Sequence, residues 1–184
     1  MRHLILMFTA VFVFTGCKST EQAPKYNTKI NTKYKESVKT YVGQLNPAEL
    51  SKLRQEVMQA LKTDWPKDQA IMVHFYQEAY NCYEYGIAEE SAKNMQRKVF
   101  QISQRWAIKN NALHFFVYTN EYLYPEQISA SGRPREDTGF FKDNVFTLNE
   151  NCRAVLIVKP NGAFYKHYGN DYFTDAMKEF WEKA

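Results

Sequence analysis

Thiol groups are the most reactive side chains of this 184-residue chain, which contains three cysteines, Cys17, Cys82 and Cys152. Cys82 lies in a polar loop that follows the apolar stretch Ile71–Tyr76, and Cys152 lies just before a second apolar stretch. A cysteine thiolate acts as a nucleophile, as a metal ligand, or as half of a redox couple when a second thiol is within reach. The three cysteines are far apart in the sequence, so any paired sulfur chemistry depends on the fold.

Two histidines are further candidate metal ligands. His74 and His114 each stand within an apolar stretch, and with Cys82 and Cys152 they supply the ligand types of a zinc site. Their spacing matches no compact ligand motif, and histidines inside apolar strands are usually hydrogen-bonded core groups. No catalytic carboxylate pair, Ser-His-Asp order or metalloprotease helix stands out, and the seven glycines do not cluster into a phosphate-binding loop. We therefore predict no metal site and no cofactor.

Tyrosines follow each of the first two predicted strands. The five are Tyr80, Tyr83 and Tyr85 after the first strand, and Tyr122 and Tyr124 after the second. In open α/β sheets, ligands bind in the crevice beyond the carboxyl ends of the strands. Tyrosines there are candidate ligand-binding residues, because their flat, amphipathic rings suit a sugar, a peptide or a partner protein. The alternative is that these rings only cover the edge of the sheet and a long loop.

The first 17 residues predict a targeting segment. Arg2 and His3 precede an apolar run of eleven residues, Leu4–Phe14. At about 1.5 Å per residue, a helix of that length covers roughly half of a hydrocarbon core about 30 Å thick. A cleaved signal peptide is therefore expected rather than a membrane-spanning anchor.

The end of this segment, Phe14-Thr15-Gly16-Cys17, resembles the lipobox of bacterial lipoproteins. The resemblance implies that residues 1–16 are removed and that Cys17 is acylated, with palmitate among the chains that anchor the protein to a membrane. Lys18 follows the cysteine where inner-membrane lipoproteins of two-membrane bacteria carry Asp, which favours the outer membrane, on its periplasmic or surface face. An ordinary signal peptide with an incidental cysteine is the alternative.

Residues 17–45 predict a flexible, lysine-rich tether, because apolar side chains are too sparse there to bury a face. Residues 18–45 contain six lysines and two glutamates, whereas residues 46–184 contain 17 basic and 18 acidic side chains. The net charge of +4 of the whole chain therefore belongs to its N-terminal part. Because the domain shows no basic face, we expect no nucleic-acid partner.

Residues 46–184 have the size of one domain. Asn46-Pro47 predicts a helix start, since Asn caps a helix and Pro suits its first position. Residues 120–151 predict irregular structure, with a turn at residues 131–134. Hydrophobic periodicity predicts an amphipathic helix from residue 47, strands 71–77 and 113–118, a helix 89–109, a hairpin of strands 154–158 and 163–168 with an Asn-Gly turn, and a closing helix 171–181.

The order helix, then βαβ, then ββα predicts an α/β fold with a central mixed sheet and helices on both faces. Over residues 47–184 this order resembles the thioredoxin-like fold, a three-layer sandwich. Ile71–Glu78 is similar to the first central strand of that family, and Ala154–Gly162 is similar to its later hairpin. The resemblance implies that the loop after the first strand is the functional region.

The family's functional residues are replaced in this chain. Tyr80-Asn81-Cys82-Tyr83 stands where the family has Cys-x-x-Cys, His74 stands at its buried carboxylate position, and Cys152 or Arg153 replaces its cis-proline. The resemblance makes the segments of Cys82 and Cys152 neighbours, which implies a disulfide between them. Two unpaired buried cysteines, or Cys82 as a lone catalytic thiolate, are the alternatives.

These patterns predict an envelope lipoprotein, anchored to the membrane, whose redox-inactive thioredoxin-like domain acts as a binding or assembly module. An envelope protein, peptide or glycan is the expected partner. The alternative is a thiol-disulfide oxidoreductase or peroxidase-like enzyme that uses Cys82, with Cys152, on envelope substrates.

Overall fold

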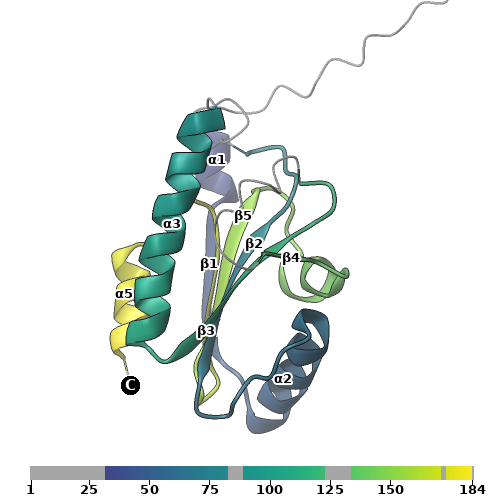
Figure 1. Ribbon diagram of the computed structural model, residues 1–184, viewed down its shortest axis with the longest axis vertical. Helices are drawn as coiled ribbons and strands as arrows, with labels where there is room; N and C mark the ends of the chain where they lie inside the picture. The colour runs from purple at the N-terminus through teal and green to yellow at the C-terminus, as the bar shows by residue number, and fades with distance from the viewer. Residues whose placement is uncertain (1–31, 83–88, 123–133, 171–172, 184) are drawn as a thin grey trace, which may run out of the picture.

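The computed structural model describes residues 32–82, 89–122, 134–170 and 173–183, which form a mixed β-sheet with helices on both faces (Figure 1). The strands are β1 (Lys39–Gln44), β2 (Ala70–Tyr76), β3 (Ala112–Tyr118), β4 (Pro134–Glu136), β5 (Arg153–Val158) and β6 (Ala163–Tyr168). The helices are α1 (Thr32–Ser37), α2 (Pro47–Leu61), α3 (Glu89–Lys109) and α5 (Asp175–Glu182), with a π-helical turn η2 (Phe141–Val145).

β2 lies in the middle of the sheet, whose strand order is β1-β6-β5-β2-β3-β4. It runs parallel to β3, with α3 between them in the sequence, and antiparallel to β5. β5 and β6 form an antiparallel hairpin, followed by α5. This order and pairing confirm the predicted thioredoxin-like α/β fold. The strand predicted at residues 71–77 is thus central and ends at Tyr76.

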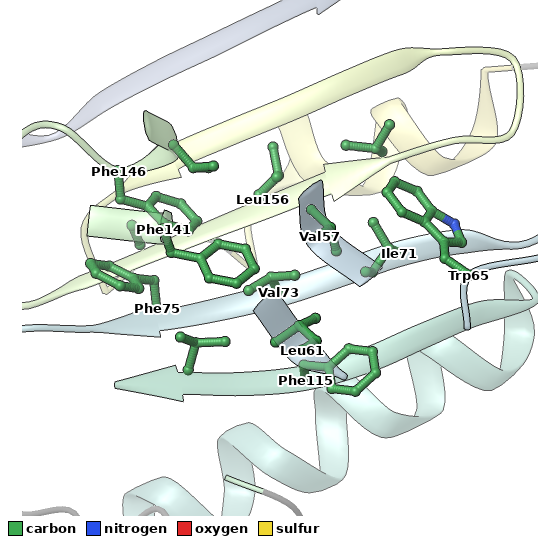
Figure 2. Close-up of a cluster of buried hydrophobic side chains, with 14 of the residues drawn as sticks. Val57, Leu61, Trp65, Ile71, Val73, Phe75, Phe115, Phe141, Phe146 and Leu156 are labelled. Carbon is green, nitrogen blue, oxygen red and sulfur yellow. The ribbon is translucent and has the colours of Figure 1, made fainter. Parts of the chain in front are cut away.

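The alternating side chains of β2 explain why helices cover both faces of the sheet. On one face, Ile71, Val73 and Phe75 belong to a buried cluster with Val57 and Leu61 of α2 (Figure 2). The same cluster contains Trp65, Phe115, Phe141, Phe146 and Leu156. Phe75 stacks on Phe146, with ring centroids 4.7 Å apart, so the turn after η2 closes this core.

The opposite face of the sheet carries the second core, under α3 and α5 (Figure 1). Its buried members are Ala70, Met72, Val155, Ile157, Tyr165, Met177, Phe180 and Trp181. Since both faces of β2 are buried, its sequence reads as a continuous apolar run rather than an alternating one.

The predicted start of α2 is confirmed in detail. Asn46 Oδ1 accepts hydrogen bonds from the backbone N–H groups of Ala48 and Glu49, each 3.0 Å long. The Glu49 carboxylate in turn accepts from the Asn46 N–H at 2.8 Å, which completes a capping box. This cap fixes where the chain leaves β1 and enters the layer that covers the first core.

The predicted tether boundary at residue 45 is wrong, because residues 32–44 belong to the folded domain. β1 pairs with β6 along its whole length, from Lys39 opposite Tyr168 to Gln44 opposite Ala163. As an edge strand it is stabilised by backbone hydrogen bonds while most of its side chains stay exposed, so its sequence carries little apolar signal. Among the α1 side chains whose burial the structure describes, Tyr34 and Ser37 are buried.

Two further expectations need correction. Residues 120–151 were predicted to be irregular, but their described part contains β4 and η2. The closing helix begins at Asp175 rather than at residue 171, because Thr174 caps it by accepting a hydrogen bond from the Met177 N–H. Residues 131–133 of the predicted turn lie outside the described residues.

Candidate functional site: a disulfide-pinned acidic groove

A disulfide joins Cys82 and Cys152, two positions for which the sequence left both a bridge and free thiols open. It connects the loop after β2 to the segment that leads into β5, with a Cα–Cα distance of 4.9 Å. Both cysteines are 0% exposed and form a small buried cluster with Ala79. The bridge therefore lies inside the protein, beyond the carboxyl end of the central strand.

Hydrogen bonds reinforce the connection between these two segments. The Gln77 N–H donates to the Cys152 carbonyl at 3.0 Å, and the Asn81 N–H donates to the Glu150 carbonyl at 3.2 Å. The buried Gln77 amide also donates to the carbonyls of Leu148 and Asn151, each at 2.8 Å. The loop after β2 is thus held by both a covalent bond and backbone contacts. The sequence analysis did not single out Gln77, because a lone Gln in a strand end has no distinctive pattern.

A groove of about 780 Å³ opens beside this pinned loop. Its lining residues are Glu36, Gln77, Glu78, Ala79, Tyr80, Asn81, Glu121, Lys142, Asn149 and Glu150. They come from α1, from the loops after β2 and β3, from η2, and from the segment before β5. The groove therefore occupies the end of the sheet where open α/β folds bind ligands.

The described lining carries four carboxylates and one ammonium group, so its formal charge is negative. Lys142 Nζ lies 3.0 Å from a Glu121 carboxylate oxygen, and this hydrogen bond lowers the pKa of Glu121. Glu150 is 3.7 Å from Lys39 Nζ, which lies outside the lining. The sequence analysis missed these glutamates, because they are far apart in the chain and only the fold brings them together.

Tyr80 and Asn81, which are adjacent in the sequence, add an aromatic ring and an amide group to the groove lining. Tyr80 is 61% exposed and offers its ring to a ligand. Asn81 is only 8% exposed, and its side-chain carbonyl oxygen is buried without a hydrogen-bond partner. A buried acceptor in this state costs free energy that a donor would recover. Asn81 is therefore a candidate binding residue that the sequence analysis passed over.

The predicted tyrosine surface is only partly present among the described residues. Tyr80 lines the groove as expected, but Tyr122 is 3% exposed and packs against Tyr76, with ring centroids 5.5 Å apart. For Tyr122 this burial favours the alternative, in which the ring covers the sheet instead of binding a ligand. Tyr83, Tyr85 and Tyr124, like the predicted lipidation site Cys17, lie outside the described residues.

The two strand histidines lie together in the core instead of in the groove. The ring centroids of His74 and His114 are 5.0 Å apart, and His74 also stacks on Phe116 at 4.7 Å. Burial, His114 and Arg153 lower the pKa of His74 well below its ordinary value. Burial also lowers the pKa of His114 to about 4. Within the described ranges, no group of three or more His, Cys, Asp or Glu side chains is placed to hold a metal ion.

A buried polar network lies at the carboxyl end of β2. The Arg153 guanidinium donates to Gln96 Oε1 at 2.8 Å and lies 5.1 Å from the Tyr76 ring centroid. Gln96 in turn donates to the Tyr76 hydroxyl at 2.6 Å. These contacts tie α3 to the carboxyl end of β2, so the network supports the loop that forms the groove.

The sequence matches no protein-family model and no curated protein. Among solved structures, the chain is similar to the thioredoxin domain of a thiol-disulfide oxidoreductase from Bacteroides vulgatus. The two share 10% sequence identity and a TM-score of 0.40, over 77% of this chain and 93% of that domain. The fold assignment stands on the strand order and pairing described above. None of the described helices is long and apolar enough to cross a membrane.

Proposed function

We propose that this protein is a lipid-anchored binding module of the bacterial cell envelope, in which a redox-inactive thioredoxin-like domain presents the acidic groove to a partner. The burial of the Cys82–Cys152 disulfide is the observation that carries this proposal. Thiol-disulfide exchange requires a thiolate to reach one of the two sulfur atoms. Both cysteines are 0% exposed, and this burial disfavours such an approach, which supports a redox-inactive domain.

The position of the disulfide supports a structural role for it. Cys82 belongs to the loop that forms one wall of the groove, and Cys152 follows the segment that forms another. A covalent bond between the two walls fixes their separation, so a partner meets a preorganised surface. In this proposal the loop that carries redox chemistry in thioredoxin-like enzymes has become a support for binding.

The cell-envelope location rests on the sequence. The apolar run before Cys17 has the length of a signal peptide, and Cys17 closes a lipobox-like segment. Acylation there would place the domain on the outer membrane, on its periplasmic or surface face. An oxidising envelope compartment also suits a protein whose remaining cysteines form a disulfide.

Thiol chemistry separates the binding module from the redox enzyme. Once Cys17 is lipidated, two cysteines remain, and we expect the denatured, unreduced protein to show no free thiol and the reduced protein to show two. An insulin-reduction assay and a peroxidase assay should give the same background rate for wild type and Cys82→Ser. Activity well above background in wild type that is lost in Cys82→Ser would overturn the proposal in favour of the enzyme.

Palmitate labelling tests the anchor separately. Wild type grown with labelled palmitate should carry label and fractionate with outer membranes. The Cys17→Ala variant should do neither. An unlabelled wild type would refute lipidation, without bearing on the groove.

A further inference from the structure

We infer that the groove binds peptide segments that carry lysine or arginine side chains. This inference rests on the proposed function, since it names the class of partner that the binding module takes. Its basis is the chemistry of the lining residues, which offers negative charge, hydrogen-bond acceptors and an exposed aromatic ring in one place.

The charge of the groove contrasts with the charge of the whole chain. Glu36, Glu78 and Glu150 lie exposed at the groove, whereas the complete sequence has a net charge of +4. That positive charge lies mainly before residue 46, since residues 46–184 contain 17 basic and 18 acidic side chains. Local carboxylates act within about 10 Å at 0.1 M salt, so a cationic ligand that binds here is selected by the groove itself.

The polar groups of the groove are mainly acceptors. Lys142 is the one cation of the described lining, and its ammonium group is already held by the Glu121 carboxylate. The amide nitrogen of Gln77 already donates to two backbone carbonyls. Carboxylates only accept hydrogen bonds, so a complementary ligand has to bring donors. Ammonium and guanidinium groups bring several donors and a positive charge.

Asn81 supplies an observation that does not depend on the carboxylates. Its side-chain carbonyl oxygen is buried and has no partner, although the residue lines the groove. A donor of a bound ligand that reaches this acceptor would remove a desolvation penalty. The neighbouring Tyr80 ring is exposed and suits a cation–π contact with the same side chain.

The size of the groove favours a peptide over a single small amine. A volume of about 780 Å³ is in the range that accommodates drug-sized ligands and exceeds what one lysine side chain fills. Several residues of an extended segment can therefore enter, with one basic side chain near Tyr80 and Asn81. A free divalent cation is less suited, since the described carboxylates do not converge on one point.

Fluorescence anisotropy on the full, lipidated protein in a non-ionic detergent tests this inference. The probes are fluorescein-labelled tetralysine and, as the matched control, tetraglutamate at the same low ionic strength. Tetralysine should bind saturably, tetraglutamate should not, and added salt should weaken the tetralysine complex. Glu36→Gln and Glu78→Gln should each weaken binding up to about fivefold, in line with exposed ion pairs. Tyr80→Ala should weaken it as well.

The control variant is Glu179→Gln, which removes one exposed carboxylate on α5, outside the groove lining. Its affinity for tetralysine should equal that of wild type. Absence of tetralysine binding, or an equal loss in Glu179→Gln and Glu78→Gln, would overturn the inference. If tetralysine binding fails in this way but insulin reduction stays at background, the inference about the ligand is refuted and the binding-module proposal remains. If insulin reduction is above background and depends on Cys82, the binding-module proposal itself is refuted, whatever the peptide assay shows.

Discussion

Acid should destabilise this fold through the histidine pair beneath α3. His74 and His114 are buried against aromatic rings, and the pKa of each is lowered. In the unfolded chain both rings titrate near their ordinary value, about 6.5. Below that pH the unfolded state binds protons that the folded state does not bind, so the free energy of unfolding falls as the pH falls. Above about pH 7 the two rings are neutral in both states and the effect vanishes.

The magnitude follows from His114, whose folded pKa is about 4. A drop from pH 8 to pH 5 crosses the unfolded pKa but stays above the folded one. On the linkage relation this lowers the free energy of unfolding by about 2 kcal/mol; the loss is about 3 kcal/mol at pH 4 and is complete only well below that pH. His74 adds to the loss in the same direction, because burial, His114 and Arg153 lower its pKa as well.

Urea denaturation at pH 8, 6 and 5 measures this dependence. His114→Phe keeps an aromatic ring beside Phe100 and Phe116 but removes one titrating group. We expect this variant to lose about 2 kcal/mol less than wild type between pH 8 and pH 5. The double variant with His74→Phe should show a flatter profile still. If wild type and His114→Phe lose the same stability over this range, the carboxylates and not the histidines control the acid response.

Three further perturbations test the disulfide, the first helix and the main core. Replacing both Cys82 and Cys152 by Ala removes a bridge that spans 70 residues, and it should lower the free energy of unfolding by about 4 kcal/mol. Equal urea midpoints for the oxidised wild type and the double variant would contradict this. Asn46→Ala removes the cap of α2 and should cost about 1 kcal/mol, with Asn46→Asp as the cap-preserving control. Leu61→Ala opens a cavity between α2 and the sheet and should lower the free energy of unfolding by about 2–5 kcal/mol, measured by thermal or urea unfolding. The control Leu61→Met keeps the side-chain volume and should lower it by less than about 1.5 kcal/mol.

The central part of the fold was predictable because its sequence signals are local. Residues 71–76 form a short apolar run of β-branched and aromatic residues, and the two faces of β2 are indeed buried by different helices. The capping box at Asn46 and the Lys159–Gly162 turn likewise depend on residues that are adjacent in the chain. Periodicity and turn chemistry are sufficient for such elements, since no distant contact is needed to specify them.

β1 and the groove were not predictable for the opposite reason. β1 is defined by its pairing with β6, more than 100 residues later, and its exposed Tyr41 and Val42 give no inward-facing pattern. The groove glutamates are spread from Glu36 to Glu150, and each alone looks like an ordinary surface charge. They become neighbours only after the strand order brings four separate segments to one end of the sheet.

The distribution of charge shows how the composition of the chain differs from the surface that the fold creates. The lysines that set the net charge of +4 lie mainly before residue 46, while carboxylates from α1 and three later loops surround the groove. A mean charge for the chain therefore suggests an anionic partner, and the local lining suggests a cationic one. Electrostatic interactions weaken over about 10 Å in 0.1 M salt, so a ligand inside the groove responds to the lining and not to the mean. In the proposed binding role, the disulfide matters for more than stability, because it joins two of the walls on which these carboxylates stand.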